Sequence, residues 1–227
     1  MQEMQSITNQ IIQFASKNHK TSDPLLEEYI KIFFSGSVGK DFVDYKIAEL
    51  FNLTASSFEF FSQKPADNFK IKIYNPTQDK DGFETSHTII NIINDDMSFL
   101  VDSVVMQFDN LGIEIKNIIH PILTAKRSKD GQIISFFKEH DRANESVMQL
   151  HLAKISDDEI PALEIRLTEV LHTVKMVVSD WSAMMDLAKK SSQNLGSQST
   201  KVSSSKNANN VNFDVTEAVH FIDWAAD

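Results

Sequence analysis

The sequence predicts an α+β protein with a helical N-terminal segment, an antiparallel sheet with helices packed on one face, and then a long helix. Two changes of hydrophobic pattern carry this prediction. Apolar residues recur at helical spacing through residues 3–63, and from Phe69 onward they alternate with a period of two. After the first alternating segment, the expected order is strand, helix, strand, strand, strand.

Residues 1–66 form the expected helical segment. Ile7, Ile11 and Phe14 share one helix face, and Asp23-Pro24 is a typical start of a further helix. The segment is rich in aromatic residues, so we expect it to pack on its neighbour. The expected helices lie near residues 7–15, 24–34, 40–52 and 56–63.

Residues 67–188 form the expected α+β domain. Residues 97–111 carry a helical stripe, and Gly112 stands where a C-cap glycine belongs. His120-Pro121 indicates a bend in a strand, because proline removes a ladder donor. Residues 128–131 indicate a hairpin turn. The expected strands cover residues 69–74, 87–93, 113–127, 132–137 and 145–155.

A long helix is expected to begin at Pro161. Its apolar residues follow at alternating steps of four and three, which is a heptad-like pattern. A helix that lies on the sheet or on the N-terminal helices explains the pattern, and a helix that contacts another subunit is the alternative. The residues of the pattern are Leu163, Leu167, Val170, Val174, Val177, Trp181, Met184 and Ala188.

Residues 189–212 are rich in Ser, Asn and Lys and carry no apolar pattern. Such a segment buries too little apolar surface to offset its ordering entropy, so we predict a flexible linker. Residues 213–227 resume an amphipathic helical pattern, with Thr216 as the expected cap. We interpret them as the start of a following domain that is truncated.

Composition and charge exclude several classes of function. The net charge of −10 argues against a nucleic-acid partner, because such binding depends on neutralising phosphates. The chain has no cysteine, which excludes disulfides and thiolate metal sites. Neither a signal peptide nor an apolar run long enough to span a bilayer is present. We therefore expect a cytoplasmic protein that does not bind membranes.

Asp95 and Asp96 are adjacent carboxylates between a strand-like and a helix-like run. Paired acids can serve as catalytic groups or metal ligands, but they can also accept the unpaired amides at the start of a helix. No second group that general acid–base work requires is visible. We therefore predict that one of the pair caps the helix that follows Asn94, and replacing both by asparagine should reduce stability only modestly.

Metal or cofactor chemistry has no clear signature in the chain. His87, His120 and His151 all fall on expected strands, where a three-histidine metal site is geometrically conceivable, but none has a compact ligand spacing. The phosphate-binding and nucleophile motifs G-x-G-x-x-G, G-x-x-x-x-G-K-[ST] and G-x-S-x-G are absent. We therefore assign no catalytic, cofactor-binding or metal-binding residue, and expect a binding or assembly module.

Several separated stretches resemble one protein family in the right order. They are YNPTQDKDGFETSHT, IINDDMSFLVDSVVMQFDNLGIEIKNIIHPILTAKRSKDGQI, ESVMQLHL, VVSDWSAMMDLA and EAVHFIDWAAD. Together they are similar to the N-terminal ACT-like region of the large bacterial NAD-dependent glutamate dehydrogenases. The resemblance covers most of residues 29–227.

The resemblance implies a non-catalytic N-terminal module for regulation or assembly. The parent enzyme would convert L-glutamate and NAD to 2-oxoglutarate, ammonium and NADH, with its catalytic lysine and dinucleotide fold downstream of this chain. NAD is thus implied for the full-length enzyme and no cofactor for this fragment. The implied partners are the downstream domains of the same polypeptide, further copies in a homo-oligomer, and an amino-acid effector.

In ACT domains the turn between the first strand and the first helix contacts amino-acid effectors. By position, the resemblance assigns this role to Asn94, Asp95, Asp96, Met97 and Ser98. The turn reads D-D-M-S, whereas ACT turns often carry a D-x-P-G pattern. A free-standing amino-acid sensor built on the ACT fold is an alternative function, and a hydrolase that uses Asp95 and Asp96 is a third.

Overall fold

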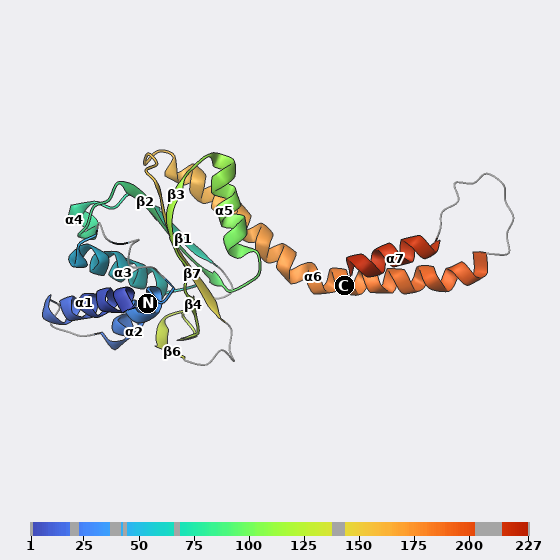
Figure 1. Ribbon diagram of the computed structural model, residues 1–227, viewed down its shortest axis with the longest axis horizontal. Coiled ribbons are helices and arrows are strands. Elements are labelled where there is room, and N and C mark those ends of the chain that lie inside the picture. The colour runs from blue at the N-terminus through green and yellow to red at the C-terminus, as the bar shows by residue number, and fades with distance from the viewer. Residues whose placement is uncertain are drawn as a thin grey trace. The chain divides into compact units, whose positions relative to one another are not determined.

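The structure is a computed structural model, and the chain forms two compact units, residues 1–172 and 173–227. We describe each unit by itself (Figure 1). The residues that the structure describes are 2–18, 23–36, 42, 45–65, 69–137, 144–202 and 215–226.

The first unit has a four-stranded antiparallel path in the order β1-β2-β7-β3, and short β4 also pairs with β7. The central strands are β2 (His87–Asp95) and β7 (Glu145–Ala153), which pair over nine residues. β1 (Lys70–Tyr74) and β3 (Ile115–Ile119) flank them. The predicted fold class, α+β with an antiparallel sheet and a long helix, is confirmed.

Helices lie on both sides of this sheet in the first unit (Figure 1). α1 (Gln2–Asn18), α2 (Pro24–Phe33) and α3 (Ile47–Ser62) form one core with Ile89 and Ile93 of β2. Because strand residues alternate, Ile90 and Ile92 face the other side, where α5 (Leu100–Leu111) and the first part of α6 (Ile160–Val202) lie. The N-terminal helices thus pack on the sheet as expected.

One helix, α3, replaces the two helices expected over residues 40–52 and 56–63. It begins after Lys46, whose backbone N–H donates to Glu49 Oε2 at 2.9 Å. Its serine and threonine hydroxyls do not interrupt it, because Thr54 Oγ1 donates to the Leu50 carbonyl at 2.7 Å. The third helix was expected to begin at residue 40, but Tyr45 forms a bend and is not helical. Residues 40, 41, 43 and 44 lie outside the described residues.

The strand expected over residues 113–127 is divided into β3, β4 (Ile122–Leu123) and β5 (Ala125–Arg127). The first break falls at His120-Pro121, which confirms the predicted bend. β5 leaves the main sheet and pairs with β6 (Ile133–Phe136) across the predicted hairpin turn. A short helix, α4 (Gln78–Asp81), interrupts the loop before β2.

The second unit contains the later part of α6 and α7 (Val215–Ala225). Residues 189–202, the first part of the predicted flexible linker, are helical and belong to α6. Packing explains the difference, because Ser192 is only 4% exposed and its hydroxyl donates to Asp223 of α7. Residues 203–214, the remainder of the predicted linker, lie outside the described residues.

The heptad-like pattern of α6 is buried only in part. Leu163 and Leu167 are buried, together with Leu171, which the pattern does not include. Trp181 and Met184 are 54% and 53% exposed. A contact of this helix with another subunit therefore stays a prediction.

Candidate functional site at the end of strand β2

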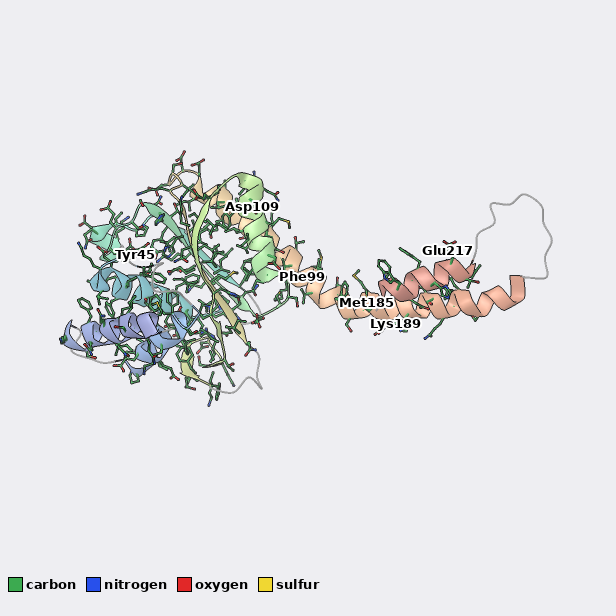
Figure 2. All side chains as sticks on the ribbon, viewed as in Figure 1. Tyr45, Phe99, Asp109, Met185, Lys189 and Glu217 are labelled. Carbon is green, nitrogen blue, oxygen red and sulfur yellow. The ribbon has the colours of Figure 1, made fainter. Side chains whose placement is uncertain are left out.

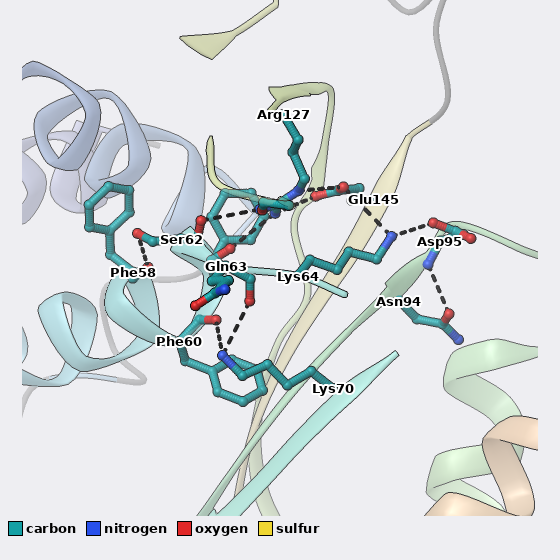
Figure 3. A network of polar contacts seen from close by, with 12 residues as sticks. Phe58, Phe60, Ser62, Gln63, Lys64, Lys70, Asn94, Asp95, Arg127 and Glu145 are labelled. Carbon is teal, nitrogen blue, oxygen red and sulfur yellow. Dashed lines mark hydrogen bonds and ion pairs between the residues drawn. The ribbon is translucent and has the colours of Figure 1, made fainter. Parts of the chain in front are cut away.

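The five predicted effector residues lie where β2 ends and the chain turns toward α5. Asn94 is buried, its Oδ1 accepts the backbone N–H of Asp95 at 2.9 Å, and its Nδ2 has no partner within the described residues (Figure 3). The backbone N–H of Asp96 donates to the Asn144 carbonyl at 2.9 Å. Met97 is half-buried, and Ser98 is exposed. The turn is therefore anchored by backbone bonds and leaves Asp96 and Ser98 open to solvent.

The prediction that Asp95 or Asp96 caps the following helix is wrong. α5 begins at Leu100, its N-cap residue is Phe99, and no side chain caps it. Phe99 has a φ of 65°, which is the left-handed region, and is 61% exposed at the start of the helix (Figure 2). This residue redirects the chain, so the helix starts too far along the sequence for either acid to reach its first amides.

Asp95 instead pairs with Lys64, a lysine buried to 6% side-chain exposure. Lys64 Nζ donates to Asp95 Oδ1 and lies 3.6 Å from Glu145 Oε1 (Figure 3). Lys64 follows the end of α3, and Glu145 is the first residue of β7. A buried ammonium requires such partners, because an isolated charge is costly to remove from water.

Glu145 is also held by Arg127 of β5 in a two-bond pair. Arg127 Nε donates to Oε1 at 2.8 Å, and Nη2 donates to Oε2 at 2.7 Å. The guanidinium further donates to the carbonyls of Gly131 at 2.8 Å and of Phe61 at 3.0 Å, and it stacks over the Phe61 ring. This geometry fills most donor positions of the guanidinium.

Basic side chains also satisfy the last carbonyls of α3. Lys70 Nζ donates to the carbonyls of Phe60 at 3.0 Å and Gln63 at 3.2 Å (Figure 3). Together with Arg127, it places positive charge at the negative end of the helix. The backbones of Gly131 and Lys64 lie so close together that a side chain on Gly131 would clash. A Cβ atom at this position would lie 1.9 Å from the Lys64 carbonyl oxygen.

These contacts define the charged network Lys64, Asp95, Arg127 and Glu145, which has two positive and two negative groups. It joins the end of α3, the β5–β6 hairpin and the two central strands. Each group already has a partner of opposite charge, so the network supports structure and offers no free acid or base for a reaction. Of its members, sequence reasoning found only Asp95. The sequence marks Lys64 and Arg127 only as charged residues at the end of an apolar run. This pattern is too common to identify them as members of a network.

The three strand histidines do not form a metal site. His87 and His151 have ring centroids 6.2 Å apart, whereas His120 lies at the β3–β4 break with its Nε2 2.7 Å from Ser146 Oγ. Among the described residues, no group of three or more His, Asp or Glu side chains is placed to hold a metal ion. Burial lowers the pKa of His120, and nearby Asp96 partly opposes that shift.

The described part of the chain also contains no helix with the length and apolarity to cross a bilayer.

Comparisons with known proteins relate this chain to one protein family. A family model described as glutamate dehydrogenase, ACT1 domain, matches residues 29–167. An NAD-specific glutamate dehydrogenase of Pseudomonas aeruginosa is 25% identical over 209 residues, and the match covers 90% of this chain and 12% of that protein. One of Halomonas elongata is 26% identical over 204 residues, covering 88% of this chain and 12% of that protein. The chain thus spans 12% of the length of these relatives.

Proposed function

Because this chain belongs to the glutamate dehydrogenase ACT1 domain family, we propose that it is a non-catalytic N-terminal module of an NAD-specific glutamate dehydrogenase, with a role in regulation or assembly. The observation that carries the proposal is the match of residues 29–167 to this domain family. The chain spans 12% of the length of the relatives, and the proposal places NAD and glutamate binding in the remainder of such an enzyme. The downstream domains and further copies of the polypeptide are its proposed partners.

The charged network supports a structural rather than a chemical role for the acids near the turn. Asp95 and Glu145 are paired with two buried cations, and Asp96 is exposed to solvent near His120. A general acid or base needs a partner group and a reacting atom within hydrogen-bond reach. Neither is available to Asp95 without breaking its pair with Lys64. This arrangement also disfavours a hydrolase built on Asp95 and Asp96.

The regulatory part of the proposal places an amino-acid effector at residues 94–98. Two features support it. The first amides of α5 receive no side-chain cap, and a helix N-terminus is a favourable position for a carboxylate. Asn94 Nδ2, which lies at the base of the turn, is a buried donor without a partner in the described residues.

Activity and binding measurements on the chain test the two parts separately. We expect no NADH formation from L-glutamate and NAD, and no saturable NAD binding, by residues 1–227. Sustained NADH production by the purified chain would refute the non-catalytic assignment. In calorimetric titrations with free L-amino acids, binding that Asn94→Leu removes would support the effector turn. Absence of binding would leave assembly as the function, and would also argue against a free-standing sensor.

A further inference from the structure

A polar pocket of about 320 Å³ opens at the start of β2, at the opposite end of that strand from residues 94–98. It lies among the first turn of α3, the loop before β2, and strands β2, β3 and β7. All nine residues that line it carry a polar or charged side chain. Polar and charged groups gathered in one pocket can hydrogen-bond a small polar ligand.

A chain of neutral hydrogen bonds runs from two residues that line the pocket, Tyr45 and His151, into the sheet. Tyr45 Oη lies 3.2 Å from His151 Nδ1, and His151 Nε2 lies 3.2 Å from Gln149 Oε1. Gln149 Nε2 donates to Asn91 Oδ1 at 2.8 Å. Because Gln149 Oε1 accepts, His151 carries its proton on Nε2, and its Nδ1 accepts from the Tyr45 hydroxyl. Burial, and the neighbouring His87, lower the pKa of His151 to about 4, so this chain of hydrogen bonds is uncharged.

One donor at the pocket has no acceptor in the described part of the chain. Asn117 of β3 pairs in register with His151, and its Nδ2 is buried without a hydrogen-bond partner. His87 Nδ1 lies 3.1 Å from Thr85 Oγ1, which also accepts the His87 backbone N–H. An oxygen atom of a ligand would satisfy the Asn117 donor.

Charged side chains of both signs line the same pocket. Glu49 of α3 and Glu84 of the loop before β2 are negative, and Lys116 of β3 is positive. Lys116 lies 2.6 Å from Glu114 in a pair that is exposed to solvent. Glu49 is 3.9 Å from Lys46, whose side chain is 84% exposed, so this acid has no buried cation as partner. The two acidic side chains disfavour a simple anion as the ligand, because like charges repel.

We propose that this pocket binds a small zwitterion, with its carboxylate beside Asn117 and Lys116 and its ammonium group beside Glu49 and Glu84. The acidic side chains come from α3 and from the loop before β2, whereas Lys116 and Asn117 come from β3. A series of amino acids with increasing distance between the two charges therefore measures how far apart the two sides of the pocket lie.

The proposed pocket is distinct from the turn at residues 94–98 and does not depend on the identity of the parent enzyme. A homologous series is the direct test: glycine, β-alanine, γ-aminobutyrate and 5-aminovalerate are titrated into residues 1–227 by calorimetry or by NMR. We expect saturable binding of at least one of these zwitterions, and at least about tenfold weaker binding of butyrate and butylamine, which lack one charge.

Substitutions separate the pocket from other surfaces. Asn117→Leu and Lys116→Met should each weaken binding of the zwitterion about tenfold. Glu84→Gln should weaken binding of the zwitterion but leave binding of butyrate unchanged. Asp102→Asn, an exposed acid on α5, is the matched control and should bind as the parent chain does. Circular dichroism and unfolding curves verify that each variant folds.

Three results would overturn the proposal. The first is no binding by any member of the series at concentrations up to about 10 mM. The second is binding that the pocket substitutions leave unchanged. The third is binding that Asn94→Leu removes, because it would place the ligand at the turn. None of these results bears on whether the chain lacks dehydrogenase activity.

Discussion

Replacing His151 by glutamine tests how strongly the buried imidazole makes folding depend on pH. His151 is 1% exposed, and burial together with His87 lowers its pKa from 6.5 to about 4. The unfolded chain binds a proton near pH 6.5, whereas the folded chain resists protonation down to about pH 4. The contribution of the neutral His151 imidazole to the free energy of unfolding is therefore fully present above pH 6.5, and it is lost as the pH falls from 6.5 toward 4.

The magnitude follows from the difference between the two pKa values. At about pH 5 the unfolded imidazole is protonated and the folded one is mostly neutral. At about 1.4 kcal/mol per pKa unit, the 1.5 units below the unfolded value correspond to a loss of roughly 2 kcal/mol of unfolding free energy. Glutamine can accept from Tyr45 and donate to Gln149 in the same positions, but it does not titrate.

Urea unfolding at about pH 7.5 and about pH 5, for the parent chain and for His151→Gln, measures this difference. The carboxylates and the other histidines titrate in both proteins, so they cancel in the comparison. We expect the parent to lose roughly 2 kcal/mol more than the variant between the two pH values. Equal losses would contradict the assignment of a buried neutral imidazole.

Two further substitutions test the charged network and the strained turn. Glu145→Gln should lower the free energy of unfolding by about 3 kcal/mol in chemical unfolding, because the two buried cations Lys64 and Arg127 would then have only Asp95 as an acidic partner. The control is Glu114→Gln at an exposed ion pair, which should cost less than about 1 kcal/mol. Equal effects of the two substitutions would contradict a buried network. Phe99→Gly should raise stability by about 0.5–1 kcal/mol by relieving the left-handed backbone, whereas Phe99→Val should lower it, and the reverse order in thermal unfolding would refute the strain.

Elements that depend on local pattern were predictable. The alternation in β1 and the apolar run of β2 gave both strands, and the stripe before Gly112 gave α5. Gly112 has a φ of 66°, as a left-handed C-cap requires. These features arise from residues within a few positions of one another.

Errors occurred where a long-range contact decided the outcome. The capping of α5 by Asp95 or Asp96 is a local expectation, but Asp95 pairs with Lys64, 31 residues earlier in the chain. Residues 189–202 lack apolar periodicity, yet they continue α6 where Ser192 bonds to Asp223 of α7. A local pattern carries no information about such partners.

The sequence by itself therefore determined the fold class, most strands and helices, and the resemblance to the glutamate dehydrogenase ACT-like region. Only the tertiary structure decided what the charged and polar groups do. It placed Asp95 and Glu145 against buried cations, and it gathered His87, Asn117 and His151 from three strands into one pocket. The physical reason is that periodicity reports which face of an element is buried, whereas charges and hydrogen bonds are satisfied by whichever groups the folded chain brings within about 3 Å.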